Sequence, residues 1–547
     1  MKRLMISAMS SGSGKTVVTC GLLALLKKSG YHVRSVKCGP DYIDPMFHSR
    51  VLGVEGENED LFLMGEKRVR EILCGNPDHT DERVGEEESF CEVCVSADHT
   101  DERIGEQSYV LAEGAMGFYD GIGGTADNSA WDIADRTDTP VLLVIRSKGQ
   151  SLSLAAQVRG FLDFRKPSHI SGVILTDCHP SLYAHLRPIL EHETGLTVFG
   201  YLPSMAEAEI PSRHLGLVTA DEISDLRNRF EKIAAQMEKT VDVEGLLRLF
   251  QRDACKEALS EPAASDFTAG DSGNKCDVPV RDSGNKCYAP AEGSGNKCDV
   301  PVGCAGNDGA SSEKAAGNVF MSTHECTVSE GVCSCRIAVA RDEAFCFYYA
   351  ESLRALREAG VEPVFFSPIH DKCLPDDISG LYLGGGYPEL YAGELGENRE
   401  MLAEIREAVN AKMPLIAECG GFLYLQKYLE DESGKVHEMA GAFSGTGRPT
   451  GHLVRFGYLY MTALQDSLLF RKGEVIPAHE FHHWDTDDNG RDLEAVRARG
   501  GQPWQCAYVS DSMYAGFPHI SLGGEMPLAE RFVERMKEFL SSSDKAY

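Results

Sequence analysis

Residues 10–16, Ser-Ser-Gly-Ser-Gly-Lys-Thr, lie between an apolar stretch at 3–8 and a helical pattern at 16–29. A strand, a glycine-rich turn and a helix in this order are typical of a phosphate-binding loop, in which backbone N–H groups at the start of the helix surround phosphate oxygens. The sequence therefore predicts that ATP is bound by Ser11, Gly12, Ser13, Gly14, Lys15 and Thr16. Met9 replaces the first glycine of the strict pattern, so a chance Gly/Ser turn before a helix is the alternative.

Apolar segments that alternate with helical patterns continue after this loop. Further strands are predicted at 32–37, 109–113, 141–145, 173–176 and 198–201. Such alternation indicates a parallel sheet with helices on its faces. We therefore expect an open α/β domain at residues 1–245, in which Lys15 reaches the β- and γ-phosphates and the Thr16 hydroxyl binds Mg²⁺.

Acidic residues follow two of the predicted strands. Asp41 and Asp44 come shortly after the second strand, Glu113 ends the third, and Asp120 lies in the turn that follows it. Ligands of a parallel sheet bind at the carboxyl ends of its strands, so we expect Mg²⁺ near Thr16, Asp41 and Glu113. Solvated loop acids are the alternative. Glu113 fits that alternative least well, because a buried carboxylate needs a cation or a partner.

Two stretches interrupt the α/β pattern. The acidic insert 75–107 holds DHTDERVGE and then DHTDERIGE, and the segment 246–335 holds SGNKC three times at a spacing of eleven residues. The second stretch has few large apolar residues and cannot offset the entropy lost on ordering, so we expect a largely disordered linker. A four-thiolate metal site made by the three repeats and Cys304 is the alternative, and Cys91 and Cys94 have metal or redox spacing without a second pair.

A second α/β domain is predicted at residues 336–540, with a helix at 345–359, and its decisive feature is Cys419. This residue lies between the strand-like PLIA and the helix-like FLYLQKYL, where a tight turn exposes a nucleophile and the helix N-terminus is expected to lower the thiol pKa. The N–H groups of an oxyanion hole would come from Gly385, Gly386 and Gly420. Two segments, 478–484 and 514–522, offer a histidine base. A buried structural thiol is the alternative.

The composition excludes several classes of function. The formal net charge of −30 disfavours non-specific binding to nucleic acid or to anionic membranes, which are polyanions. No apolar run approaches the roughly 18 residues that a membrane span needs. A large chain with 18 cysteines and no export signal is expected to keep its thiols reduced, so the sequence predicts a cytoplasmic enzyme.

The order of these motifs resembles that of the CobB/CobQ-type glutamine amidotransferases. The resemblance is carried by SSGSGKT, KCGPDYIDPMFH, EGAMGFYDG, GGGYPELYA, AECGGFLYL and AHEFHHW, and it covers the chain outside the two inserts. It implies a dethiobiotin-synthetase-like ATP domain followed by a class I-like glutaminase domain. It also implies that Cys419 is the nucleophile and that His519 activates it, although Ser521 stands where ordinary triad glutaminases have glutamate.

The same resemblance implies an activity. The expected reaction is the ATP- and glutamine-dependent amidation of the a and c acetates of cobyrinate, a corrinoid, in cobalamin biosynthesis. Asp44 and Asp120 would serve carboxylate activation, and Arg213 and His214 would help to bind the corrinoid. The alternatives within the family are nickel-sirohydrochlorin a,c-diamidation and cobyric acid synthesis. The alternative from another class is a ParA-like ATPase switch with an inactive glutaminase domain. The expected partners also include a second copy of this chain, in a homodimer.

Overall fold

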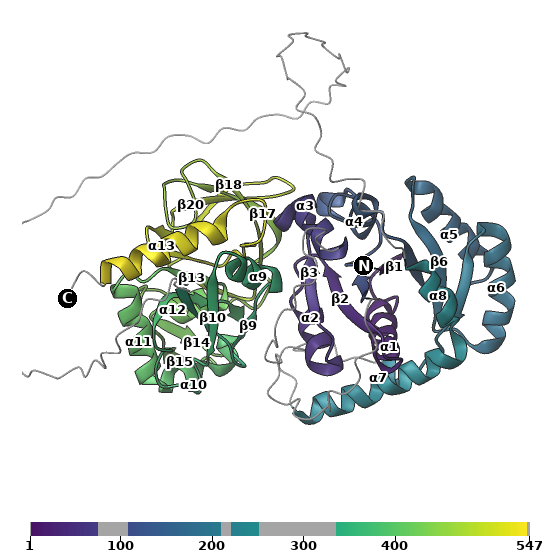
Figure 1. Ribbon diagram of the computed structural model, residues 1–547, viewed down its shortest axis with the longest axis horizontal. Coiled ribbons are helices and arrows are strands. Elements are labelled where there is room, and N and C mark those ends of the chain that lie inside the picture. Colours follow the sequence, from purple (N-terminus) through teal and green to yellow (C-terminus); the bar gives the residue numbers. More distant parts are fainter. Residues whose placement is uncertain (1, 75–107, 209–219, 251–334, 544–547) are drawn as a thin grey trace, which may run out of the picture. The chain divides into compact units, whose positions relative to one another are not determined.

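The computed structural model describes residues 2–74, 108–208, 220–250 and 335–543 (Figure 1). These residues belong to one compact unit made of Met1–Leu259 and Ser334–Tyr547. The predictions made for the insert 75–107, for Arg213 and His214, and for the cysteine repeats lie outside the described residues.

The N-terminal part is built on a seven-stranded sheet in the order β3-β2-β4-β1-β5-β6-β7. Every neighbouring pair is parallel, as predicted from the alternation of strands and helices. The strands are β1 (Lys2–Ala8), β2 (His32–Cys38), β3 (Gly56–Glu59), β4 (Ser108–Glu113), β5 (Val141–Arg146), β6 (Ile170–Thr176) and β7 (Thr197–Tyr201). β3 is an additional edge strand that the sequence pattern did not reveal.

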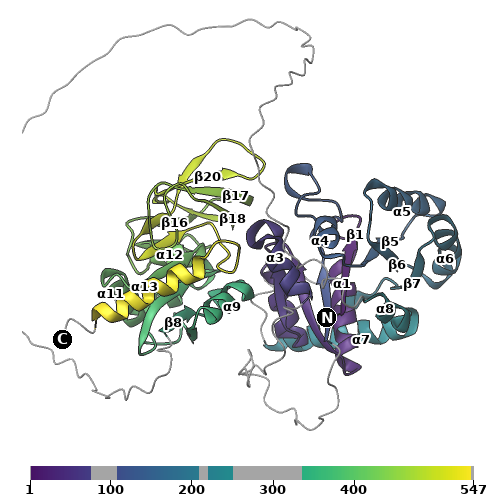
Figure 2. The same cartoon turned by 45° about the horizontal axis from the view of Figure 1, so that its top comes forward.

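Helices cover both faces of this sheet, because side chains of a strand alternate between its faces. In β1, Leu4 and Ile6 pack in one core cluster with α1 and α7, whereas Met5 packs in another with residues of α3 to α6. The helices are α1 (Lys15–Lys28), α2 (Ile43–Phe47), α3 (Leu61–Cys74), α4 (Ala130–Thr137), α5 (Leu152–Phe164), α6 (Pro180–Thr194), α7 (Ala220–Thr240) and α8 (Val243–Leu249). Figure 2 shows α5 and α6 side by side next to β5, β6 and β7.

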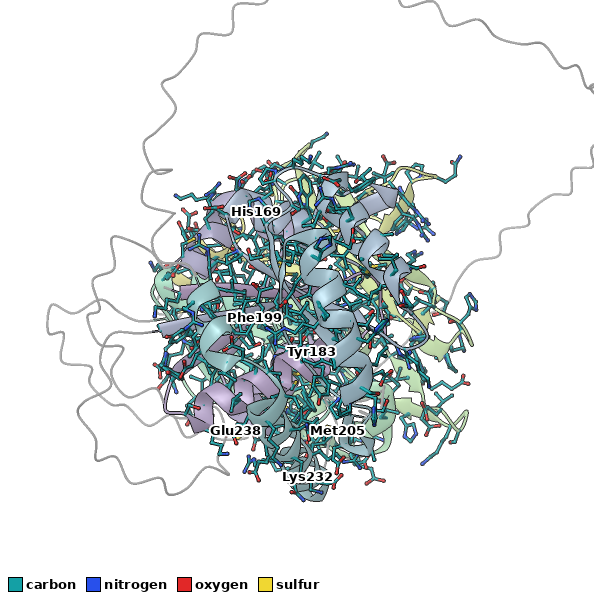
Figure 3. All side chains as sticks on the ribbon, turned by 90° about the vertical axis from the view of Figure 1, so that its right-hand side faces the viewer. His169, Tyr183, Phe199, Met205, Lys232 and Glu238 are labelled. Atoms are coloured by element: carbon teal, nitrogen blue, oxygen red, sulfur yellow. The ribbon has the colours of Figure 1, made fainter. Side chains whose placement is uncertain are left out.

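The outer edge of the sheet is closed by α6, α7 and α8. Tyr183 of α6 donates a hydrogen bond to the Val198 carbonyl at 3.4 Å, and the Phe199 carbonyl accepts one from the Asp242 N–H at 2.7 Å (Figure 3). Phe250 is buried in the same core as Phe199. Ordered structure therefore continues past the predicted domain boundary at residue 245.

The C-terminal part contains a six-stranded sheet in the order β10-β8-β11-β13-β23-β22. All neighbouring pairs are parallel except β22 with β23. Its strands are β8 (Cys335–Ala340), β10 (Val361–Phe366), β11 (Ile378–Leu383), β13 (Leu415–Glu418), β22 (Tyr508–Ser510) and β23 (Met513–Gly516). The helices are α9 (Ala350–Glu358), α10 (Ala392–Glu397), α11 (Arg399–Asn410), α12 (Gly420–Leu425) and α13 (Leu528–Ser543).

The helix predicted at 345–359 is wrong in its first turn. Phe345–Phe347 forms β9, which pairs with β12 (Gly385–Gly386), and the helix begins only at Ala350. The reason is tertiary: Phe345 is fully buried and packs in the core around β11 and β13, which favours an extended backbone there. Local helical periodicity could not reveal this pairing.

Two further sheets, one mixed and one antiparallel, were not expected from the sequence. They have the orders β15-β14-β16-β19 and β18-β17-β20-β21. Their strands are β14 (Tyr428–Glu430), β15 (Val436–Glu438), β16 (Thr446–Pro449), β17 (Arg455–Ala463), β18 (Val475–His482), β19 (Trp484–Thr486), β20 (Leu493–Arg497) and β21 (Trp504–Cys506). Short 3₁₀ segments lie at Ile122–Gly124, Ala206–Ala208 and Pro388–Tyr391, and a π-helical turn lies at His48–Leu52.

The described helices and cysteines bear on two further expectations. Within these ranges, no helix combines the length and the apolar character needed to cross a bilayer. Cys74 is disulfide-bonded, so the expectation that all thiols are reduced is wrong at this position. Free thiols are found at Cys20, Cys38, Cys178, Cys335, Cys346, Cys373, Cys419 and Cys506.

Candidate active site

The predicted phosphate loop connects β1 with α1 and has the backbone that anion binding requires. Gly14 has a φ of 90°, in the left-handed region that favours glycine, and it immediately precedes the first residue of α1. The loop is held from β6, because the Thr176 hydroxyl donates to the Ser13 carbonyl at 2.8 Å. A cavity of about 390 Å³ adjoins the loop and is also lined by Arg146 and Lys148. Lys148 favours an anionic ligand in the cavity, whereas Arg146 is paired with Asp177.

Lys15 lies buried beside the loop and points at the carbonyls that surround it. Its Nζ donates hydrogen bonds to the carbonyls of Met116 and Ser10. Burial, and then the positive charge of Lys37, lower the pKa of Lys15 below its ordinary value. Glu113, Asp120 and Asp44 act in the opposite direction. Three of the predicted acids therefore gather around the predicted phosphate-binding lysine.

Glu113 is the centre of this polar cluster and is almost completely buried. Its Oε1 accepts hydrogen bonds from the Thr16 hydroxyl at 2.8 Å and from Lys37 Nζ at 3.0 Å. Lys37 also forms an ion pair with Asp44. Burial alone would lower the pKa of Lys37, but Glu113 and Asp44 raise it above its usual value, so the lysine is charged.

Lys37 is a functional candidate that sequence reasoning missed. It lies in the stretch 37–48, of which only the acids were expected to take part in a site. The available signal was a lysine near the carboxyl end of an apolar strand, since a buried ammonium requires carboxylate partners.

Asp41 and Asp120 have backbone partners in turns of the same region. Asp41 Oδ1 accepts the Ile43 N–H at 2.9 Å, and Asp120 Oδ2 accepts the Gly117 N–H at 2.9 Å. Burial, and then the negative charge of Asp44, raise the pKa of Asp41. Burial also opposes the charge of Asp44, yet Lys37 holds the pKa of Asp44 below its usual value.

The oxygen atoms around Thr16 fit a magnesium ion. Glu113 Oε2 is buried and has no hydrogen-bond partner, whereas Oε1 of the same carboxylate accepts the Thr16 hydroxyl. In the described ranges, no group of three or more His, Cys, Asp or Glu side chains forms a metal cage. Mg²⁺ does not need such a cage, because it is usually held by one or two carboxylates together with phosphates and water.

Cys419 occupies the turn between β13 and α12, and its backbone is strained. Its φ of 49° and ψ of −99° are unusual for a non-glycine residue, as in a nucleophile elbow. The Cys419 N–H donates to the Gly516 carbonyl of β23 at 2.8 Å, which holds the turn. The residue is 8% exposed.

The expectation of a lowered thiol pKa at Cys419 is wrong for this structure. Burial raises this pKa, and the negative charges of Glu389 and Glu480 add to the effect. The Gly420 N–H at the start of α12 opposes the shift but does not overcome it. The thiol therefore needs a base to form a thiolate.

The three glycines predicted for the oxyanion hole meet around this elbow. A methyl group on Gly385 would lie 2.7 Å from His519 Cε1 and 3.4 Å from Nε2. A methyl group on Gly420 would lie 3.1 Å from the Gly386 nitrogen. Gly385 and Gly386 form β12. Small residues at these three positions keep the space beside the imidazole open.

The structure also distinguishes the two histidine segments. His519 follows β23, and its backbone exchanges two hydrogen bonds with His479 of β18, at 2.8 and 3.0 Å. His482 instead contacts Glu480 Oε1 at 2.9 Å and stacks on Phe517, with ring centroids 3.9 Å apart. Only His519 lies against the Gly385 turn, which agrees with the role that the family resemblance implies for it.

Aromatic residues join His519 to the loop that carries Asp41 and leads into α2, the helix that carries Asp44. The ring centroid of Tyr42 lies 5.2 Å from that of His519 and 4.4 Å from that of Tyr349. Phe347 also stacks on Tyr42, with ring centroids 5.1 Å apart. Tyr42 lies in the quoted stretch at 37–48, and nothing in its local sequence indicates these contacts.

A second aromatic group lies on one face of the β17–β18 pair. Phe456 and Phe481 are cross-strand neighbours and are 57% and 47% exposed. Tyr458 follows on the same face and donates to Asp60 Oδ2 at 2.6 Å. Its hydroxyl would lie 3.6 Å from a methyl group on Gly39, in the stretch that leads to Asp41. This exposed aromatic face therefore continues to the acidic loop.

Comparisons with known proteins match both halves of the chain. Residues 4–218 match a CobQ/CobB/MinD/ParA nucleotide-binding domain, and residues 336–525 match a CobB/CobQ-like glutamine amidotransferase domain. The chain is 32% identical to the cobyrinate a,c-diamide synthase of Caldanaerobacter subterraneus subsp. tengcongensis, covering 98% of both chains. It is 31% identical to the cobyrinate a,c-diamide synthase of Salmonella typhimurium, again over 98% of both. The expected pair of α/β domains is thereby confirmed.

The space beside His519 generates a prediction about Gly385. Gly385→Ala should reduce the rate of glutamine hydrolysis by about tenfold or more, because small displacements of a catalytic group are costly. The control is Gly393→Ala in α10, where the nearest atom to an added methyl group is 3.6 Å away. Glutamate release measures both variants. Equal rates for the two would contradict the placement of His519 at the site.

Proposed function

The chain belongs to the cobyrinate a,c-diamide synthase family of glutamine-dependent, amide-forming ligases, and we propose that it amidates the a and c acetates of cobyrinate with ATP. The observation that carries the proposal is that one chain places a phosphate-loop lysine and threonine near a buried carboxylate, and places the cysteine elbow and a histidine beside one glycine turn. Lys15, Thr16 and Glu113 make one site, and Cys419 and His519 make the other. Amidoligase and glutaminase domains at 1–245 and 336–540 are the proposed division of labour.

The first site would activate a carboxylate. One oxygen of a substrate acetate attacks the γ-phosphorus of ATP and gives an acyl phosphate and ADP. Lys15 would neutralise the negative charge that spreads over the phosphate oxygens. Mg²⁺ held with the nucleotide at Thr16 and Glu113, and near Asp41, would add further positive charge. Asp44 and Asp120 would keep Lys37 and the surrounding turn in place.

The second site would release ammonia from glutamine. His519 takes the thiol proton of Cys419, and the thiolate attacks the side-chain carbonyl of glutamine. The N–H groups of Gly385, Gly386 and Gly420 would stabilise the oxyanion. His519 then protonates the leaving ammonia, and water hydrolyses the γ-glutamyl thioester to glutamate. Burial of Cys419 makes this proton transfer to His519 necessary at neutral pH.

The two reactions would be linked by transfer of ammonia. Tyr42 lies in the acidic loop and contacts His519, and its other neighbours, Phe347 and Tyr349, are aromatic. Such a lining excludes bulk water and leaves the neutral ammonia molecule unprotonated. We propose that ammonia passes beside Tyr42 and displaces phosphate from the acyl phosphate.

The exposed face of β17 and β18 would hold the corrin ring. A corrin offers a broad apolar surface with carboxylates at its edge, and aromatic side chains such as Phe456 and Phe481 pack well on such surfaces. The Tyr458–Asp60 hydrogen bond connects this face with the acidic loop, where a peripheral acetate would be activated. Arg213 and His214 remain proposals for binding the other carboxylates.

Division of labour can be tested with two substitutions. Cys419→Ala should abolish glutamine-dependent synthesis but preserve synthesis with high ammonium, because only the nitrogen source is lost. Lys15→Ala should reduce synthesis with either nitrogen source by about 100-fold or more, since the phosphate charge is no longer neutralised. Phosphate release and product mass measure both. A Cys419→Ala enzyme that is folded but inactive with ammonium would refute the two-site scheme.

The substrate is tested by product mass. With cobyrinate, ATP and glutamine, the product should be a diamide with no amidated propionate. Four or more amidations would assign the chain to the cobyric acid branch, and activity confined to nickel-sirohydrochlorin would assign it to the nickel branch. ATP hydrolysis without any amidation would favour the ParA-like switch. Sedimentation and cell fractionation would test the proposed homodimer and cytoplasmic location.

The corrin face gives a separate prediction. Phe456→Ala should raise the KM for cobyrinate by about tenfold, because burying an aromatic ring contributes a few kcal/mol at most, and should leave the KM for ATP unchanged. Val475→Ala is the control, since Val475 is 54% exposed on β18 but six residues from Phe481. Initial rates with ammonium as the nitrogen source avoid effects on the glutaminase. An unchanged KM for cobyrinate in Phe456→Ala would place the ring elsewhere.

A further inference from the structure

We propose that Glu418, the residue immediately before the nucleophile, is the carboxylate that orients His519. This inference rests on the proposed role of His519 as the base for Cys419. His519 Nδ1 lies 3.5 Å from Glu418 Oε2. Both side chains are buried, and Nδ1 has no hydrogen-bond partner. A small movement on substrate binding would close this distance to a hydrogen bond.

A base in a nucleophile–base pair is usually held by a third group. That group binds one ring nitrogen, fixes the tautomer and stabilises the imidazolium that forms when the base takes a proton. Ser521 occupies the position two residues after His519, and a hydroxyl supplies no negative charge there. The fold supplies a carboxylate from a different strand, 101 residues earlier in the chain.

Glu418 is held firmly enough to act in this way. It ends β13, where it is paired with Gly516 of β23. Its Oε1 accepts the Ile520 N–H at 3.0 Å, and its Oε2 accepts the Tyr382 hydroxyl at 3.0 Å. The first bond ties the carboxylate directly to the residue after His519. The carboxylate is therefore held beside the imidazole, by β11 on one oxygen and by the backbone next to His519 on the other.

The orientation of the imidazole agrees with this role. Nδ1 faces Glu418, whereas Cε1 and Nε2 lie against the Gly385 turn of the elbow. A proton on Nδ1, held by Glu418, leaves the lone pair of Nε2 free on the side of Gly385. His519 can then take the thiol proton on Nε2 and return it to ammonia.

The electrostatic surroundings of His519 single out Glu418. Across the described residues, it is the one carboxylate that forms an ion pair with His519. His479 is the histidine that packs against His519. Burial, followed by the charge of His519, lowers the pKa of His479 to about 3, so His479 is neutral. The phenols of Tyr42, Tyr382 and Tyr514 surround the pair, and burial raises the pKa of each, so they stay neutral. A buried carboxylate with no Lys or Arg partner gains most when His519 becomes positive.

The test is Glu418→Gln, which keeps the size of the side chain and removes its charge. The kcat for glutamine hydrolysis should fall by about 100-fold or more with little change in KM, because the variant favours the wrong imidazole tautomer. The second readout is the rate at which iodoacetamide alkylates Cys419, followed against pH by mass spectrometry of the Cys419 peptide. Loss of the charge that stabilises the imidazolium should move the midpoint of alkylation to higher pH, because this effect outweighs the weak direct repulsion by which Glu418 raises the pKa of Cys419.

Two further variants separate positioning from a structural role. Tyr382→Phe removes a hydrogen bond to the same oxygen but keeps the charge, and should change kcat by less than about threefold with an unchanged midpoint. Glu418→Asp keeps the charge and should recover part of the lost rate, and it remains informative if Glu418→Gln does not fold. Ammonium-dependent synthesis reports folding in every case.

These variants separate failure of the role proposed for Glu418 from failure of the proposed glutaminase function. A folded Glu418→Gln enzyme with the parental kcat and alkylation midpoint would overturn the role of Glu418. A Tyr382→Phe enzyme whose midpoint shifts as far as that of Glu418→Gln would overturn it as well. Glutamine hydrolysis that survives in Cys419→Ala would instead refute the glutaminase site itself.

Discussion

A buried ammonium group between two carboxylates organises the first site. Lys37, the next-to-last residue of β2, lies opposite Glu113 of β4, and the register of the two strands places these side chains together. Asp44, in the first turn of α2, completes the group. Removing one partner from such a buried group typically costs about 3–5 kcal/mol, because a charge is left unpaired. The group therefore fixes the acidic loop relative to the sheet, and with it the surroundings of Lys15.

The second site is also built on a strand, a tight turn and a helix, and here the turn residue itself has a strained backbone. Cys419 has a left-handed φ, and the turn is held by its bond to Gly516 and by the packing of Gly420 and Gly421 against the glycine-rich turn after β11. Parallel strands end at one edge of their sheet, so neighbouring strands contribute His519, Glu418 and the Gly385 turn to one place. Both sites thus depend on which strands are neighbours.

Much of this arrangement was predictable from the sequence. The phosphate loop and the cysteine elbow are short motifs whose residues act within one turn of backbone, so their spacing is visible in the sequence. Parallel strands in the first domain follow from their alternation with helices. The prediction failed at Phe345–Phe347, where pairing with Gly385–Gly386 overrides local helical periodicity. It also failed for the thiol pKa of Cys419, because burial and two distant carboxylates outweigh the start of a short helix.

The sequence by itself determined that this protein has one phosphate loop and one cysteine elbow in two α/β domains, because each of these depends on neighbouring residues. Only the tertiary structure decided which histidine lies beside the glycine turn of the elbow, that Lys37 neutralises Glu113, and that Glu418 faces His519. These pairs join residues about 75 to 100 positions apart, so no local sequence motif reveals them. Their partners are selected by strand order and burial, since a charged group removed from water is stable only beside an opposite charge.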